Sequence, residues 1–200
     1  MSDQDQDSLH GSVPDRSNVV LVLIDVINRF DFPGAEDLLK HADPMAVRLS
    51  KLVARARQEK IAIVYVNDNF GRWTSDREHL LQAGLESGSA GREFVSLIKP
   101  LDTDYFVIKP KHSGFFNTTL DLLLRHLQAR TLILTGLATN ICVLFTANDA
   151  YMRDYQVVVA SDCCAAEVES DHQAVLALME KVLKATISVS DELDLARLGR

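Results

Sequence analysis

The sequence predicts an α/β fold in which a doubly wound, mainly parallel six-stranded sheet is flanked by helices, a Rossmann-like three-layer sandwich. Six short apolar, β-branched runs alternate with segments whose apolar residues recur at helical spacing. The chain has 200 residues and 47% of them are hydrophobic, which suffices for one domain with a full core. Residues 1–17 are polar and lack periodicity, so we expect a flexible N-terminal arm before a single domain over residues 18–200.

Three strands and three helices are expected in the first half of the domain. The strands are the apolar runs at residues 18–24, 61–66 and 105–108. The helices follow the helical apolar period at residues 45–59, 77–83 and 92–98. A strand, a helix and a second strand in this order form a right-handed crossover with parallel strands.

The second half continues the same alternation. Strands are expected at residues 131–135, 156–160 and 184–190. Helices are expected at residues 117–127, from residue 141 onward, and at residues 171–183. Because Gly136 bounds the fourth strand, Cys142 is expected at the start of the helix that follows it.

Three reactive side chains are expected at strand ends. Asp25 follows the first strand, Lys109 the third, and Cys142 the fourth. Open α/β sheets bind their ligands at the carboxyl ends of their strands. Each residue also has an ordinary interpretation: Asp25 alone is better explained as a helix N-cap, Lys109 as a solvated lysine, and Cys142 as a small core residue.

The chemistry of these groups suits nucleophilic catalysis. A helix N-terminus lowers the pKa of a thiol, so Cys142 is expected to attack a carbonyl carbon. Asp25 would accept the thiol proton and return it to a departing amine, while Lys109 would stabilise the thiolate. The N–H group of Cys142 and one from the turn at residues 136–138 would stabilise the oxyanion.

Two loops are candidates for the wall of a substrate pocket. Residues 28–34 and 67–73 combine aromatic and polar side chains directly after the first two strands, although ordinary surface loops have the same composition. Substrate-binding candidates are Phe30, Asn69, Trp73 and Phe115.

Charge and cysteine content narrow the class of partner. The net charge of -7, with a pI near 5.3 and no run of Lys or Arg, argues against nucleic acid and membrane surfaces and favours a small-molecule substrate. Three cysteines, two of them the adjacent Cys163 and Cys164, suit a reducing compartment, and no segment resembles a signal peptide. A cytoplasmic protein is expected, with Cys163 and Cys164 as packing residues.

Three segments together resemble the isochorismatase-like cysteine hydrolases: VLVLIDVINRF, VIKPKHSGFFNTTL and LTGLATNICVLFTANDAYMRDYQVVVASDCCA. The similarity covers most of the chain from residue 18 to about residue 190. It implies that Asp25 is the base, Lys109 its partner and Cys142 the nucleophile. It also implies that Ala138 and Cys142 supply the oxyanion N–H groups and that the peptide bond entering Ala138 is cis.

The lysine of this family precedes a serine by four positions. That spacing to Ser113 selects Lys109 rather than Lys111. The family resemblance further implies a homo-oligomer, and a homodimer or homotetramer is expected. The helix that begins at Cys142 supports this expectation, because Phe145, Tyr151 and its other apolar residues exceed what one sheet face needs.

Differences between this sequence and other members of the family narrow the type of reaction that is expected. Nicotinamidases of the family hold a metal through an Asp-x-His motif, where this chain reads Asp68-Asn69-Phe70, and its six histidines are scattered. No metal and no cofactor are therefore expected. Since Cys142 is retained, hydrolysis of an amide, carbamoyl or ureido C–N bond is favoured over the vinyl-ether hydrolysis of true isochorismatases. A non-catalytic nucleotide-binding or redox domain is disfavoured, because Gly-x-Gly-x-x-Gly and Cys-x-x-Cys are absent from the sequence.

Overall fold

The computed structural model describes residues 16–199. Residues 1–15, most of the expected N-terminal arm, lie outside the described residues, as does Arg200. Ser17 was expected in the arm but belongs to the domain. Its N–H donates to the Leu127 carbonyl at 2.8 Å, and its hydroxyl accepts the Ala62 N–H at 2.9 Å.

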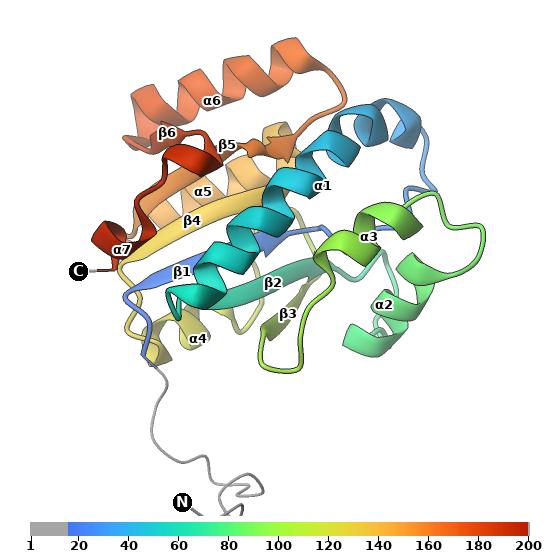
Figure 1. Ribbon diagram of the computed structural model, residues 1–200, viewed down its shortest axis with the longest axis horizontal. Coiled ribbons are helices and arrows are strands. Elements are labelled where there is room, and N and C mark those ends of the chain that lie inside the picture. The colour runs from blue at the N-terminus through green and yellow to red at the C-terminus, as the bar shows by residue number, and fades with distance from the viewer. Residues whose placement is uncertain (1–15, 200) are drawn as a thin grey trace, which may run out of the picture.

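A six-stranded sheet forms the centre of the molecule, with the strand order β3-β2-β1-β4-β5-β6 (Figure 1). The strands are Val19–Ile24 (β1), Ala62–Asp68 (β2), Tyr105–Lys109 (β3), Thr131–Leu137 (β4), Gln156–Ala165 (β5) and Thr186–Ser188 (β6). Every neighbouring pair is parallel, so the sheet is fully parallel and not only mainly so. The order reverses between β1 and β4, which is where doubly wound sheets leave a crevice for ligands.

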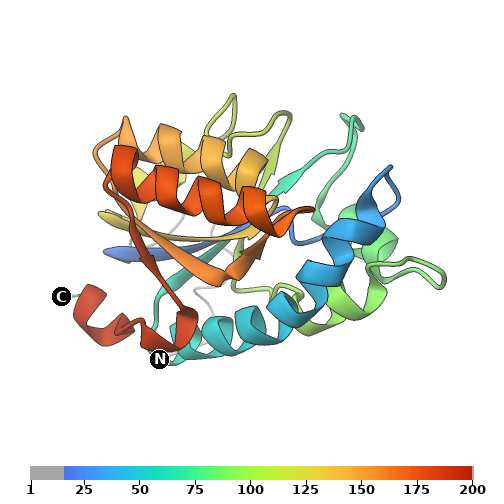
Figure 2. The same cartoon turned by 90° about the horizontal axis from the view of Figure 1, so that it is seen from above.

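Helices cover both faces and complete the expected three layers. They are Ala35–Gln58 (α1), Arg77–Leu85 (α2), Arg92–Ile98 (α3), Leu120–His126 (α4), Leu144–Tyr151 (α5), Glu169–Leu183 (α6) and Leu195–Leu198 (α7), with a π-helical turn at Thr139–Val143 and a 3-10 turn at Ser190–Glu192. Figure 2 shows α5 and α6 on one face of the sheet and α1 on the other.

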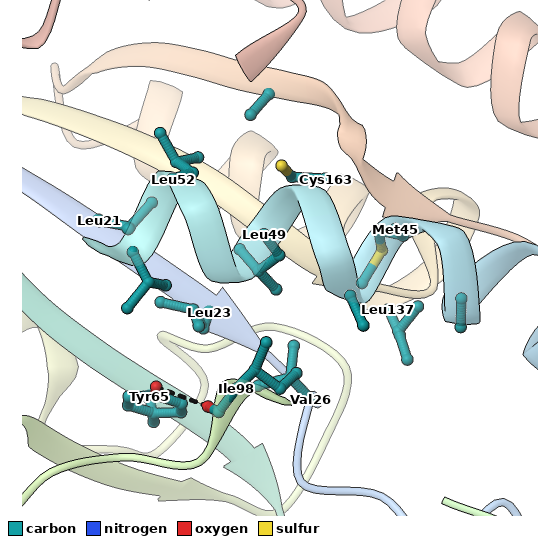
Figure 3. Packing of buried hydrophobic residues seen from close by; sticks show 14 of the residues in the cluster. Leu21, Leu23, Val26, Met45, Leu49, Leu52, Tyr65, Ile98, Leu137 and Cys163 are labelled. Atoms are coloured by element: carbon teal, nitrogen blue, oxygen red, sulfur yellow. Dashed lines mark hydrogen bonds between the residues drawn. The ribbon is translucent and has the colours of Figure 1, made fainter. Parts of the chain in front are cut away.

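Alternate residues of each central strand divide between two cores, because successive side chains point to opposite faces of a sheet. Leu21 and Leu23 of β1 pack on the α1 side, and Val20 and Val22 pack with α4, α5 and α6. Figure 3 shows the α1 side, where the Tyr65 hydroxyl also donates to the Ile98 carbonyl at 2.8 Å. β1 is buried on both faces, which explains its unbroken apolar sequence.

Among the expected boundaries that were wrong, two have identifiable reasons. α1 begins at Ala35 and passes through Pro44, whereas the expected helix began at residue 45. A proline removes one helical hydrogen bond, but the buried Leu38 and Ala42 continue the apolar face of the helix. β6 is only Thr186–Ser188, because the chain then enters the 3-10 turn at Ser190–Glu192.

Gly136 supports the first stability prediction. Its φ is 114°, and a Cβ atom there would lie 2.0 Å from the backbone oxygen of Ile24 in β1. We expect Gly136→Ala to lower the free energy of unfolding by about 3 kcal/mol or more, because both backbone conformation and space exclude a side chain. Denaturant unfolding measures this change.

Gly34 provides the matched control. It also has a positive φ, 85°, but a Cβ atom there would meet nothing within 4 Å. Gly34→Ala should therefore lower the free energy of unfolding by only about 1 kcal/mol, which is the cost of placing alanine at a positive φ. Equal losses at the two positions would contradict the close approach of β4 to β1.

Candidate active site

The carboxyl ends of neighbouring strands bring four reactive side chains together. Asp25 follows β1, Asp68 and Lys109 end β2 and β3, and Cys142 follows β4 in the π-helical turn. Lys109 lies at the centre of this group. Its Nζ atom is 2.8 Å from Asp25 Oδ2, 3.3 Å from Asp68 Oδ2 and 3.5 Å from Cys142 Sγ. The structure thus unites the three residues that the sequence selected.

Lys109 is the lysine of the cluster and Lys111 is not, as the sequence spacing indicated. Lys109 is fully buried, whereas Lys111 is exposed. The loop after β3 is fastened to α5, because the Gly114 N–H donates to Thr146 Oγ1 at 2.9 Å and the Ser113 hydroxyl bonds the Asp149 carboxylate. These contacts hold the end of β3 against α5, the helix that follows Cys142.

Backbone contacts fix Asp25 in the site. Its N–H donates to the Val66 carbonyl at 3.0 Å, and its Oδ1 accepts the Asp68 N–H at 2.7 Å. The Asn67 amide group bonds both the N–H and the carbonyl of Ile27. No helix begins at Asp25, so the N-cap interpretation was wrong: the carboxylate faces β2 and Lys109 instead.

The turn after β4 presents Cys142 to this cluster. The Leu137–Ala138 peptide bond is cis, as the family resemblance implied. The Ala138 carbonyl accepts the N–H groups of Ile141 and Val143, which closes the turn around Cys142. Ala138 and Cys142 are 8% and 9% exposed, so little of either residue is in contact with solvent.

Burial dominates the acid–base properties of the site. It raises the pKa of Asp25, while the Lys109 ammonium and a hydrogen bond with the Cys142 thiol oppose the rise. Burial also raises the pKa of the Cys142 thiol, and the Asp25 carboxylate raises it further, against a lowering by Lys109. For Lys109, burial opposes the charge, but the Asp25 and Cys142 charges raise its pKa overall.

The expected lowering of the thiol pKa was therefore wrong. The helix N-terminus was the only influence that the sequence revealed, whereas the folded chain adds desolvation and a neighbouring carboxylate. Burial therefore favours the neutral form of the Cys142 thiol and increases the basicity of the Asp25 carboxylate beside it.

Sequence reasoning missed two residues of the cluster. The sequence places Asp68 in a candidate pocket wall and at the position of a family metal ligand, yet in the structure it shares the Lys109 ammonium with Asp25. His112 had been counted among scattered histidines, yet its Nδ1 lies 4.0 Å from Cys142 Sγ. The available signals were that Asp68 ends its strand and that His112 follows Lys109 by three positions.

The four expected substrate-binding residues do not share one pocket. Asn69 lines a cavity of about 240 Å³ together with Arg29, Arg72 and other residues of the loops after β1 and β2. Trp73 is 82% exposed and is absent from that lining.

Phe30 and Phe115 also differ from expectation. Phe30 is buried and packs edge-on against Phe94, with ring centroids 5.3 Å apart. Phe115 is buried and stacks on Tyr155 at 6.1 Å. Phe30 therefore belongs to the hydrophobic core on the α1 side of the sheet, and Phe115 belongs to the core on the opposite side. Their assignment to substrate binding has no support from these contacts.

Residues 16–199 contain neither a candidate metal cluster nor a membrane-spanning helix. Within that range no group of three or more His, Cys, Asp or Glu side chains could hold a metal ion. Among the same residues, no helix has both the length and the apolar character needed to cross a lipid bilayer.

Comparisons with known proteins agree with this geometry. An isochorismatase domain model matches residues 19–191. An uncharacterized isochorismatase family protein of Bacillus subtilis, YaaI, is 40% identical, with 89% of this chain and 97% of that protein covered. A ureidoacrylate amidohydrolase, RutB, of Methylorubrum extorquens is 30% identical, with 74% and 70% covered.

A solved structure extends the comparison to three dimensions. N-carbamoylsarcosine amidase from Thermoplasma acidophilum superposes with a TM-score of 0.66 at 29% identity, covering 88% of this chain and 99% of that one. The domain match spans nearly all of the folded residues and contains Asp25, Lys109 and Cys142. This chain belongs to the isochorismatase family.

Proposed function

We propose that this chain is a metal-independent cysteine hydrolase that cleaves the C–N bond of a small amide, carbamoyl or ureido compound. One observation carries the proposal: the Cys142 thiol lies 3.5 Å from an ammonium that is itself 2.8 Å from the Asp25 carboxylate. The names of two relatives support it, since one is a ureidoacrylate amidohydrolase and another an N-carbamoylsarcosine amidase.

The reaction would proceed in two stages. Asp25 takes the thiol proton while the sulfur of Cys142 bonds to the carbonyl carbon, and the carbonyl π electrons move to oxygen. The N–H groups of Ala138 and Cys142 stabilise that oxyanion. When the oxyanion collapses, the C–N bond breaks and the amine leaves with the proton from Asp25. Water then hydrolyses the thioester and restores the thiol.

Lys109 would act by electrostatics. Its ammonium lies between the Asp25 and Asp68 carboxylates, so it offsets their mutual repulsion in a buried place. The charge that develops on Cys142 during attack also lies within its reach. Because Lys109 is completely buried, solvent screens these interactions little.

The substrate is proposed to carry a carboxylate as well as the cleaved group. The cavity beside Asn69 is lined by Arg29 and Arg72, and also by Asp31. Arg29 is paired with Asp31 and Glu86, whereas Arg72 has no side-chain partner among the described residues. Arg72 is therefore the residue that we propose to bind the carboxylate. Arg72→Met should raise KM for carboxylate substrates and leave KM for neutral ureas unchanged.

A screen for released ammonia tests the proposed function. N-carbamoylglycine, N-carbamoylsarcosine, simple ureas and small amides would be offered to the chelator-treated protein. Turnover of at least one of them, abolished by thiol alkylation, is the expected result. Turnover that needs added zinc, iron or manganese would contradict the metal-independent mechanism. Vinyl-ether hydrolysis that persists in Cys142→Ala would favour isochorismatase chemistry instead.

The pH profile follows from the state of Asp25. The carboxylate must be unprotonated to accept the thiol proton, so kcat/KM should fall as pH decreases through its pKa. Burial raises that pKa above the ordinary value of 3.8, and the acid limb should lie correspondingly higher. An acid limb at or below 3.8 would contradict the raised pKa, and a profile without an acid limb would contradict the role of Asp25 as base.

We also propose that the chain forms a homodimer or homotetramer in the cytoplasm. An apolar groove of about 230 Å³ lies between α5 and α6 and is lined by Leu144, Phe145, Asn148, Leu178, Val182 and Leu183. Apolar patches of this kind are typical of subunit interfaces. Sedimentation should give a multiple of 22.2 kDa at micromolar concentration, and the monomer mass would contradict the proposal. The three free cysteines support a reducing compartment.

A further inference from the structure

His172 joins α6 to the turn that carries the nucleophile. It lies in the first turn of α6 and is 7% exposed. Its Nδ1 atom is 2.8 Å from Thr139 Oγ1, and Thr139 is completely buried. Thr139 directly follows Ala138, whose N–H is one of the two proposed oxyanion donors. No step of the proposed reaction uses His172.

The surroundings of His172 favour the neutral form of its ring. Burial lowers the pKa of His172, and His41 of α1 lowers it further, while Glu169 of α6 opposes them. His172, His41 and Glu169 line a cavity of about 660 Å³. The remaining charged or titratable residues of its lining are Arg48, Asp162, Cys164 and Glu180. A neutral imidazole has one nitrogen that can accept a hydrogen bond, so Nδ1 can receive the Thr139 hydroxyl proton.

We propose that His172 is a positioning residue that holds Thr139, and through it the Ala138 N–H, in the direction of the oxyanion. This inference rests on the proposed function. Thr139 Oγ1 has no other side-chain or backbone partner among the described residues. Without His172 the buried hydroxyl would be left unpaired, and the turn would shift to relieve it.

Loss of the His172 side chain should destabilise only the transition state of the reaction. An oxyanion donor interacts with charge that exists only after the sulfur has attacked, so its displacement lowers kcat and leaves KM nearly unchanged. Misplacement of such a group by about 1 Å can cost about 100-fold in rate. We therefore expect His172→Leu to reduce kcat by about 10-fold to 100-fold.

Conservative variants separate positioning from simple packing. The side-chain amide of His172→Asn can occupy the place of Nδ1 and should keep kcat within about threefold of the parent. Thr139→Ser should likewise retain kcat, while Thr139→Val should lose it as His172→Leu does. Thr139→Val and His172→Leu each remove the same hydrogen bond. The double variant should therefore have a kcat no lower than that of either single variant. Additive losses would overturn the proposal.

A second readout needs no knowledge of the substrate. Iodoacetamide alkylates Cys142 by displacement of iodide and forms no oxyanion, so its rate should be equal in the parent and in His172→Leu. Propionaldehyde adds to the thiol as a hemithioacetal: the thiol proton passes to Asp25, a C–S bond forms, and the carbonyl π electrons move to an oxygen that the turn stabilises. Protection of Cys142 by propionaldehyde should require at least about tenfold more aldehyde in His172→Leu.

The outcomes are distinguishable. Equal protection in the parent and in His172→Leu would overturn the positioning role, as would a parallel fall in the iodoacetamide rate, since that would indicate general disruption of the site. A parent protein whose Cys142 is neither alkylated nor protected would overturn the proposed function, and this inference with it.

Discussion

Cys142→Ser should fold normally and lose turnover by about 10³-fold or more, because a hydroxyl is a far weaker nucleophile than a sulfur assisted by the same base. The site offers Asp25 as that base and Lys109 as the nearby cation, and both are fixed by contacts that do not involve the sulfur. The free energy of unfolding should consequently change little. Steady-state kinetics and denaturant unfolding together measure the effect.

Cys163 provides the control for this variant. It is fully buried in the core on the α1 side, and burial raises the pKa of its thiol to about 12. Cys163→Ala should keep kcat while losing some stability from the cavity that it leaves. Full activity in Cys142→Ser, or inactivity in a folded Cys163→Ala, would contradict the assignment of the nucleophile.

Lys109→Met should damage both stability and activity. Removing the ammonium leaves the Asp25 carboxylate buried beside Asp68 without a counter-charge, and breaking a buried pair in this way costs about 3–5 kcal/mol. Turnover should fall by about 10²-fold or more, because a carboxylate that takes up a solvent proton cannot serve as the base. Unfolding and activity measurements at several pH values test both effects.

The stability lost in Lys109→Met should depend on pH in a definite direction. Burial raises the pKa of Asp25 above 3.8, and loss of Lys109 would raise it further. A carboxyl group whose pKa is higher when folded binds more protons in the folded state, so stability falls as pH rises above the unfolded pKa. The deficit of Lys109→Met should thus be smallest near pH 3.8 and should increase toward neutrality.

A double variant separates the two effects of Lys109. Asp25→Asn combined with Lys109→Met removes both members of the buried pair and should recover much of the stability at neutral pH. It should recover none of the activity, since the base is absent. A stable, active Lys109→Met single variant would contradict the electrostatic account of the site.

The fold was predictable because its signals are local. Apolar runs with no polar break identified β1, β2 and β4, and these strands are buried on both faces as such runs require. The start of α1 was missed because Pro44 is a local signal against helix, while the packing that overrides it involves residues distant in sequence. Propensity alone cannot weigh that tertiary contribution.

The candidate site was predictable only in part. Strand ends and family resemblance together selected Asp25, Lys109 and Cys142, which the structure brings together. The sequence predicted the wrong direction for the shift in the pKa of the Cys142 thiol, because desolvation arises only when the chain is folded. Phe30 and Trp73 were chosen by residue type, but whether a loop residue turns inward or outward depends on packing that the sequence does not display.

Capture of the covalent intermediate tests the central claim most directly. Turnover of an N-carbamoyl substrate would be quenched in acid from the first turnover through the steady state and digested with trypsin. Residues 131–153 then form a peptide that contains Cys142 and neither of the other cysteines. The account predicts that this peptide gains a carbamoyl group on Cys142 during turnover and loses it when substrate is exhausted. An unmodified Cys142 in every quenched sample, while the substrate is consumed, would contradict it.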